Sequence, residues 1–383
     1  MSAVRTHGRR TLVPWHQEMP HSAKLHPRIL PQRGIKMKKE ISQTSGRNFG
    51  HIPPPDGSTP DTRPPLVIIA GPTAVGKSEV AVELALRIHG SVISADSMQV
   101  YRGMDIGTAK ISPEQRKGIP HYLIDLIDPR ETWNVVRFQQ EARKALAEIY
   151  GEGRIPILCG GTGFYIQALL YDIDFTAMQE DLPLRESLLA VYRQDGPEAL
   201  HERLRAVDPV SAEAIHPNNV KRVIRALEYY AACGKPISAH NEAERNKPAA
   251  FRTASFVLWM DRETLYRRID DRVDRMFEEG LTDEVRRLKE KGLREADVSM
   301  QGLGYRQILA ALDGTISMEE ARERIKQETR HFSKRQITWF RREPQFQWID
   351  RSAYPDTAAL VEELDSRVRA IFGQMDLPGR KES

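Results

Sequence analysis

The stretch LVIIAGPTAVGKSEVA (66–81) decides the fold of this chain. Its first five residues form an apolar run that predicts a buried strand, and a helical pattern begins at residue 78. The turn between them, GPTAVGKS, fits the pattern GxxxxGK followed by Ser or Thr, in the strand–turn–helix context that this pattern requires. Backbone N–H groups of such a turn converge on phosphate oxygens, and the helix N-terminus adds positive potential.

We therefore predict a phosphate-binding loop made of the residues Gly71, Pro72, Thr73, Ala74, Val75, Gly76, Lys77 and Ser78. Lys77 would contribute a point charge, and the Ser78 hydroxyl suits a Mg²⁺ ion. The usual ligand of such a loop is ATP, but the motif identifies neither the phosphate-bearing ligand nor the reaction.

Short β runs alternate with helical patterns beyond the loop, which is typical of a parallel α/β sheet. The predicted strands are 66–70, 91–95, 122–127, 156–160 and 255–260, and the clearest helices are 78–89, 135–150 and 163–171. After residue 261 the chain is predicted to be almost entirely helical. The predicted fold class is α/β: a P-loop NTPase-like parallel sheet flanked by helices, with a helical insertion domain and a helical C-terminal region.

Changes in composition divide the chain. Residues 1–62 are rich in Pro, Gly, His and Ser and are predicted to be a disordered extension. It is either a mitochondrial targeting segment or, as we prefer, a mis-started extension with Met37 as a possible true start. Residues 175–250 lack a convincing strand and are predicted to form a helical insertion into the sheet domain, which comprises 63–174 and 251–350. A C-terminal helix and tail, 351–383, complete the chain.

Bulk properties exclude several classes of protein. The two cysteines, Cys159 and Cys233, have no metal-ligand spacing, so we expect neither a zinc site nor a disulfide framework. No apolar run approaches the length of a membrane span, and we expect a cytoplasmic monomer. The net charge of +4 is too small to indicate a nucleic-acid partner by itself.

Asp96 lies at the end of the second predicted strand, where parallel α/β sheets place their chemistry. A carboxylate there could accept a proton from a nucleophile or hold Mg²⁺ through water; equally, it could only cap the next element. Asp125 and Asp128 could instead mimic the acidic strand end of an ATPase, which keeps an ATP-using enzyme possible.

An ordered series of motifs resembles the tRNA dimethylallyltransferase family, also called tRNA isopentenyltransferases. The series spans roughly residues 65 to 345 and comprises GPTAVGKS (71–78), ISADSMQVYRGMDIGTAK (93–110), PHYLIDLIDP (120–129), GRIPILCGGTGFYIQALL (153–170), HPNNVKRVIRALE (216–228), QGLGYRQI (301–308) and KRQITWFRR (334–342). The resemblance implies transfer of a dimethylallyl group from dimethylallyl pyrophosphate to N6 of adenine 37, beside the tRNA anticodon. The loop would then grip a leaving pyrophosphate.

The resemblance also implies roles for individual residues. Asp96 would be the base for the adenine amine, and Thr162 would lie against the reacting groups. Phosphate contacts at lower priority are Lys235, Arg268 and Arg272, for which ion pairs with nearby aspartates are the alternative. The predicted contacts with the tRNA anticodon stem-loop are Asp96, Ser97, Met98, Gln99, Thr162, Arg185, Lys221, Arg222, Val223, Ile224, Arg225, Gln301, Gly302, Gly304, Tyr305, Arg306, Lys334, Arg335, Gln336, Thr338, Trp339 and Arg341.

Two other activities remain open from the residues alone. An adenylate dimethylallyltransferase acting on free nucleotides would have little use for the helical insertion or for the basic run 334–342. A P-loop small-molecule kinase would use the same loop but would consume ATP. No cysteine follows Cys233, so we expect no C-terminal zinc finger of the kind that eukaryotic members often carry.

Overall fold

The computed structural model describes residues 61–175 and 182–373, and its centre is a parallel sheet. The strand order is β3-β2-β4-β1-β5-β6, and all neighbours pair in parallel. The strands are β1 (Pro65–Ala70), β2 (Gly90–Ser94), β3 (His121–Tyr122), β4 (Ile155–Gly160), β5 (Arg252–Trp259) and β6 (Gln347–Asp350). The predicted P-loop NTPase-like α/β class is confirmed.

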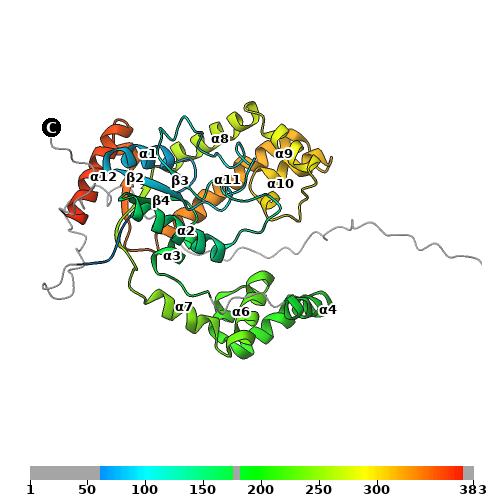
Figure 1. The fold of residues 1–383 in the computed structure, drawn as a ribbon. Coiled ribbons are helices and arrows are strands. Elements are labelled where there is room, and N and C mark those ends of the chain that lie inside the picture. Colours follow the sequence, from blue (N-terminus) through cyan, green and yellow to red (C-terminus); the bar gives the residue numbers. More distant parts are fainter. Residues whose placement is uncertain (1–60, 176–181, 374–383) are drawn as a thin grey trace, which may run out of the picture. The chain divides into compact units, whose positions relative to one another are not determined.

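Helices cover both faces of the sheet, because strands such as β1 and β4 are apolar on both sides. One apolar core joins the sheet to α1 (Lys77–Ile88) and α12 (Thr357–Phe372), which pack side by side (Figure 1). The other core joins it to α2 (Val135–Gly151), α3 (Gly163–Leu170), α9 (Leu281–Glu290), α10 (Tyr305–Leu312) and α11 (Met318–Phe340). Helix α8 (Arg262–Glu278) contributes side chains to both cores.

The predicted helical insertion contains α4 (Leu182–Val207), α5 (Pro209–Ala214), α6 (Val220–Cys233) and α7 (Ile237–Arg245). These helices have a small apolar core of their own, centred on Leu200, Leu204 and Val223. Asp208 ties them together: it caps α5 through the Ser211 amide and also accepts from the Ser238 amide and hydroxyl.

Two sequence-based predictions about strands were wrong. Only His121 and Tyr122 form β3, because Leu123 and Asp125 adopt positive φ angles of 64° and 55° that a strand cannot contain. The edge strand β6 was missed, since its four residues lie in a charged region with no alternating pattern. The predicted N-terminal extension lies almost wholly outside the described residues.

Candidate active site

The loop between β1 and α1 requires glycine at two points. Gly71 has φ +142°, and a Cβ there would lie 2.4 Å from the Leu258 carbonyl oxygen of β5. Gly76 has φ +94° and precedes α1. Inside the turn, the Lys77 Nζ donates to the Pro72 carbonyl oxygen at 2.7 Å. This hydrogen bond closes the turn on itself.

Gln336 of α11 supports this loop directly. Its Oε1 accepts from the Thr73 amide at 2.9 Å, and its Nε2 donates to the Gly161 carbonyl oxygen at 3.0 Å. A Cβ at Gly161 would lie 2.1 Å from that Nε2, so the glycine is needed for the contact. The predicted tRNA contact through the buried Gln336 side chain is therefore corrected: its amide connects the phosphate loop to the GGTG turn.

Asp96 and Thr162 come together at the ends of β2 and β4. The Thr162 amide donates to the carbonyl oxygen of Ala95 at 3.3 Å. Asp96 does cap its turn, since Oδ1 accepts from the Met98 amide at 2.8 Å; Oδ2 has no hydrogen bond among the described residues. Thr162 stands at the N-cap of α3, yet its side chain makes no cap hydrogen bond. A carboxylate oxygen and a hydroxyl are thus left for another partner.

Three arginines lie beside the phosphate loop. The Arg268 Nε donates to the Ala74 carbonyl oxygen at 3.0 Å, and the Arg351 guanidinium lies about 3.2 Å from where a Cβ on Gly76 would stand. Arg272 is half-buried and has no acidic partner within residues 61–175 and 182–373. The alternative was ion pairs with Asp270, Asp271 and Asp274, but among the described residues neither Arg268 nor Arg272 forms one. Asp270 pairs with Arg330 and Asp274 pairs with Lys326.

Burial and like charge disfavour the charged forms of the basic side chains in this region. Burial, together with the nearby Arg272, lowers the pKa of the Lys77 ammonium to about 8. Burial likewise lowers the pKa of the Arg272 guanidinium, helped by Arg268 and Arg275. Such unfavourable burial of positive charge is relieved when an anion binds, so the loop and α8 together suit a polyanionic group.

The segment Ser97–Gln99 contacts the QGLG turn. The Met98 side chain packs against the backbone of Gly302. A Cβ added to Gly302 would lie only 2.6 Å from Met98 Cε, so this close contact requires glycine. Gln99 is held in place, because its Oε1 accepts from the Ser94 hydroxyl at 3.0 Å. Ser97 and Met98 are half-buried.

Glu284 of α9 is an organising residue that sequence reasoning missed. Its buried carboxylate accepts from the amides of Asp105, Ile106 and Gly107 at 2.8, 2.9 and 3.1 Å. It also accepts from the Tyr305 hydroxyl at 2.7 Å. The predicted tRNA contact of the fully buried Tyr305 side chain is corrected accordingly: it joins two loops from inside. No local signal distinguished Glu284 from other charges on α9.

Lys110 explains the unusual MDIGTAK segment. Its side chain is 4% exposed, and Nζ lies 2.6 Å from carboxylate oxygens of both Asp105 and Asp125. Asp125 is therefore neutralised in a loop and does not stand free at a strand end. This placement argues against the hypothesis that Asp125 acts as the acidic strand end of an ATPase.

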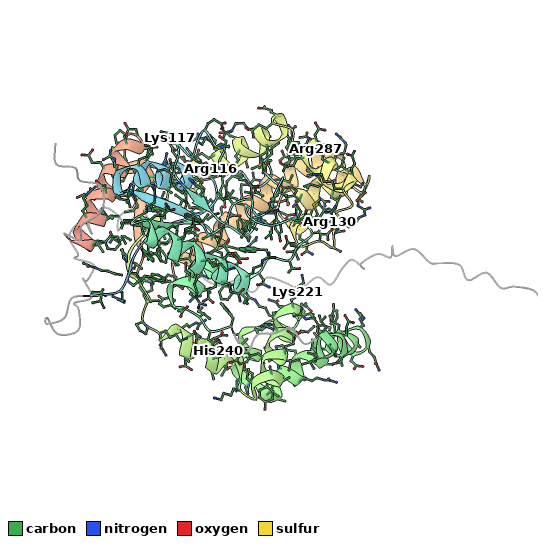
Figure 2. The ribbon with its side chains drawn as sticks, viewed as in Figure 1. Arg116, Lys117, Arg130, Lys221, His240 and Arg287 are labelled. Carbon is green, nitrogen blue, oxygen red and sulfur yellow. The ribbon has the colours of Figure 1, made fainter. Side chains whose placement is uncertain are left out.

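The basic side chains of the insertion divide into exposed and engaged groups. Lys221 and Arg222 are exposed on the first turn of α6, where Figure 2 labels Lys221. Val223 and Ile224 are buried in the insertion's own core, which corrects their predicted contact with tRNA. Arg185 and Arg225 both pair with the buried Glu228, at 2.7 and 3.4 Å.

The C-terminal end of α11, together with its C-cap residue Arg341, carries a group of exposed cations. Lys334, Arg335 and Arg341 are exposed and have no acidic partner in the part of the chain that the structure describes. Thr338 is also exposed, and Trp339 is partly buried against Gly163. In the QGLGYR turn, by contrast, Arg306 pairs with Glu328.

Comparison with known proteins decides the family. The profile of the IPP transferase family matches residues 99–343, and that of the isopentenyl transferases matches residues 64–128. A tRNA dimethylallyltransferase of Lachnoclostridium phytofermentans is 53% identical over 300 residues, which cover 78% of this chain and 96% of that protein. The chain belongs to the tRNA dimethylallyltransferase family.

Solved members of this family share the fold. The tRNA isopentenylpyrophosphate transferase of Bacillus halodurans matches with a TM-score of 0.60 and 42% identity, over 80% of this chain and 97% of that one. A eukaryotic dimethylallyltransferase, captured acting on tRNA, matches with a TM-score of 0.67 and 31% identity, over 79% of this chain and 78% of that one. Membership in the dimethylallyltransferase family disfavours a kinase.

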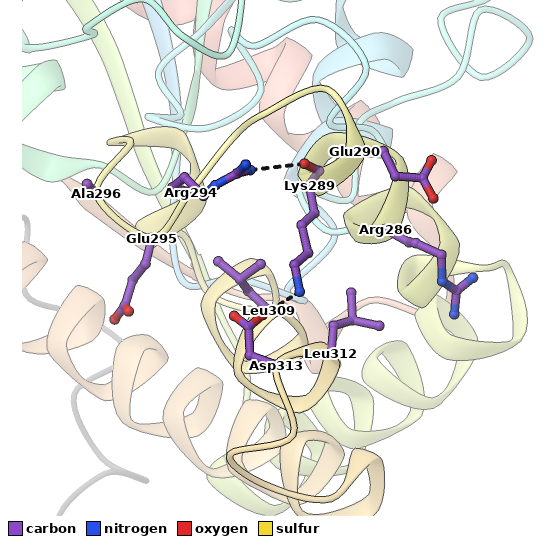
Figure 3. Close-up of a pocket in the computed structure, with 9 residues that line it drawn as sticks. All are labelled: Arg286, Lys289, Glu290, Arg294, Glu295, Ala296, Leu309, Leu312 and Asp313. Carbon is purple, nitrogen blue, oxygen red and sulfur yellow. Dashed lines mark hydrogen bonds and ion pairs between the residues drawn. The ribbon is translucent and has the colours of Figure 1, made fainter. Parts of the chain in front are cut away.

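A separate pocket of about 1000 Å³ lies between α9 and α10 (Figure 3). Its lining includes Lys289, which pairs with Asp313, and Arg294, which donates to the Lys289 carbonyl oxygen at 3.1 Å. None of the predicted dimethylallyltransferase site residues lines it. Because the pocket is lined from α9, α10 and the segment between them, it does not belong to the site at the phosphate loop.

Neither a cluster of acidic, His or Cys side chains suited to a metal ion nor a membrane-spanning helix occurs among the described residues. Within residues 61–175 and 182–373, no group of three or more His, Cys, Asp or Glu side chains could hold a metal ion. Over the same residues, no helix has both the length and the apolarity needed to cross a membrane.

Proposed function

We propose that this chain transfers a dimethylallyl group from dimethylallyl pyrophosphate to N6 of adenine 37, next to the tRNA anticodon. One observation carries the proposal: a phosphate loop with unneutralised cations, Lys77 and Arg272, lies beside Asp96 and Thr162, whose Oδ2 and hydroxyl are unused. The phosphate-gripping and proton-accepting parts of a prenyl transfer thus stand at one edge of the sheet.

The reaction breaks the donor's C–O bond and forms a bond between its carbon and N6. The departing pyrophosphate takes the electron pair of the broken bond, and its growing charge is stabilised by the loop amides, Lys77, Arg268 and Arg272. The amine loses a proton as it becomes bonded to carbon, and Asp96 accepts it. Thr162 orients the reacting groups through its hydroxyl.

Mg²⁺ fits the loop as a companion of the pyrophosphate. The exposed Ser78 hydroxyl would supply one oxygen ligand, and the described residues contain no acidic cluster to hold the ion alone. Most of the remaining ligands would come from the pyrophosphate and water, as is usual for Mg²⁺ at phosphates. When bound, the ion would withdraw negative charge from the leaving group.

The RNA partner is an anticodon stem-loop whose target base leaves its stack. Lys221, Arg222, Lys334, Arg335 and Arg341 supply exposed positive charge for the phosphate backbone. The adenine must turn out of the loop to reach Asp96, and Ser97 and Met98 border that position. We infer a cytoplasmic monomer, because cytoplasmic ribosomes use the tRNA product and one chain contains every element of the site.

The test is product formation by the purified chain with dimethylallyl pyrophosphate, Mg²⁺ and unmodified tRNA. A nucleoside digest should contain N6-dimethylallyladenosine, and its absence with every tRNA that carries adenine 37 would contradict the proposal. Competition between AMP and tRNA as acceptors separates this activity from adenylate dimethylallyl transfer.

Asp96→Asn tests the proton acceptor. The amide oxygen can still cap the Met98 turn, so the fold is preserved while the base is lost. We expect kcat to fall roughly 10²- to 10⁴-fold with little change in tRNA affinity. Turnover close to the wild-type rate would show that Asp96 is not the base.

A further inference from the structure

Phe164 is an exposed aromatic side chain on an otherwise buried helix. It is 46% exposed, whereas its neighbours Tyr165 and Ile166 on α3 are 7% and 0% exposed. It stands two residues after Thr162, in the first turn of α3. A single exposed apolar side chain is ordinary on a protein surface, so the position of this ring next to Thr162 is what draws attention to it.

The ring of Phe164 is fixed in orientation. It meets the ring of Phe175 edge to face, with centroids 6.2 Å apart and planes at 77°. Phe175 is 7% exposed and is anchored in a small apolar cluster with Ala168 and Ile173. Since its support is buried, Phe164 keeps its exposed surface without collapsing onto the protein.

Positive charge lies on the neighbouring helix. The adjacent Gly163 packs directly against the Trp339 ring of α11. A Cβ added to Gly163 would lie only 2.2 to 2.5 Å from atoms of that ring. The C-terminal end of α11 carries the exposed Lys334 and Arg335, and its C-cap residue Arg341 is exposed too. Helix α3 thus presents an exposed planar ring and the helix packed against it presents cations without acidic partners. This combination binds unpaired nucleotides, the ring through stacking and the cations through phosphates.

We propose that Phe164 is a stacking platform for an unpaired RNA base next to the acceptor adenine. This inference rests on the proposed function. The acceptor itself must meet Asp96 and Thr162, which lie at the strand ends. Phe164 is exposed two residues after Thr162, so the base that follows or precedes the acceptor is the one we assign to its ring. Phe164 is thus a positioning residue that holds the loop open while the adenine reacts.

Steady-state kinetics with an unmodified anticodon stem-loop RNA test this role. Phe164→Leu keeps an apolar side chain and removes the ring face, so the KM for RNA should rise roughly 5- to 100-fold, while the KM for dimethylallyl pyrophosphate stays constant. Phe164→Trp should restore the KM for RNA. Leu86→Ala is the matched control, because Leu86 is 49% exposed on α1 and should leave both constants unchanged.

A fluorescent base gives a second readout. With 2-aminopurine placed on either side of the acceptor, the wild-type complex should quench one of the two positions, and Phe164→Leu should relieve that quenching. An unchanged KM for RNA in Phe164→Leu would overturn the proposal. So would a rise only in the KM for the donor, which would mean that the ring contacts the prenyl group. If wild-type protein makes no product, the proposed function fails instead, and the fluorescence assay still reports on stacking.

Discussion

The basic run of α11 and its C-cap has two halves, 321–330 and 334–341, which carry the same type of side chain in opposite electrostatic settings. In the first half, Arg324 pairs with Glu320 at 2.5 Å, Lys326 with Asp274 at 2.8 Å and Arg330 with Asp270 at 2.6 Å. In the second half, Lys334, Arg335 and the C-cap residue Arg341 meet no carboxylate among the described residues. In the sequence alone, residues 321–342 form one continuous basic segment in which the two groups cannot be told apart.

The difference separates charge that serves the fold from charge left for a partner. A neutralised cation contributes little to the field outside the protein, and an exposed ion pair itself stabilises by only about 0–1 kcal/mol. The same contrast recurs at the phosphate loop, where Lys77 and Arg272 are unneutralised, and in the insertion, where Arg185 is bound to Glu228. Whether a cation is paired thus indicates its role better than its position in a motif does.

The largest expected effect comes from an unneutralised arginine at the leaving group. Arg272→Gln should reduce kcat roughly 10²- to 10³-fold, because charge developing on the pyrophosphate loses a partner inside a partly buried site. Initial rates at saturating tRNA, with donor concentration varied, measure this loss.

Arg330→Gln is the matched control for Arg272→Gln. Arg330 is also partly buried, but it donates to both oxygens of Asp270 at 2.6 and 2.8 Å. Its loss should lower the midpoint of thermal unfolding and leave kcat within about threefold of wild type. Equal losses of kcat in the two variants would refute the distinction between paired and unpaired cations.

The pH dependence of donor binding gives the next largest effect. Because burial lowers the pKa of Lys77 to about 8, the free protein loses this charge as the pH rises through 8, and a bound pyrophosphate raises the pKa again. Affinity for dimethylallyl pyrophosphate should therefore fall up to about tenfold per pH unit above 8. Titration calorimetry between pH 7 and about 10 measures it.

The same pKa fixes the sign of a stability change. The unfolded chain holds the Lys77 proton up to its ordinary pKa of 10.5, whereas the folded, donor-free protein releases it near 8. The contribution of Lys77 to the free energy of unfolding therefore rises with pH across that window. Lys77→Gln should bind the donor weakly and remove the pH dependence of binding; if the slope persisted, another group would be titrating.

Much of the fold could be predicted because its signals are local. The apolar runs 66–70 and 156–160 are buried on both faces and became β1 and β4 almost residue for residue. The predicted strand at 122–127 failed because Lys110, distant in sequence, binds Asp125 and helps hold the chain in a turn. A contact between two separate segments leaves no periodic pattern in the sequence, so it could not be predicted.

The candidate site shows the same limit. The positions of the phosphate loop and Asp96 followed from strand–turn–helix patterns, which are properties of a short segment. The functions of Gln336 and Glu284 depend on which loop lies opposite them, and that is set by how α9 and α11 pack against the sheet. Predictions based on motif membership therefore assigned Gln336 and Tyr305 to the RNA when both are buried.

The smallest effect tests the two halves of α11 directly. Arg335→Ala removes an exposed cation without an acidic partner, so tRNA binding should weaken several-fold and the slope of log K against log salt concentration should fall by roughly 0.7 to 0.9. Arg324→Ala removes a cation paired with Glu320 on the same helix and should leave the slope unchanged. Filter-binding titrations at several salt concentrations measure both slopes. If both variants shifted the slope equally, the RNA would contact the whole of α11, and ion pairing within the helix would not reserve its first half for the fold.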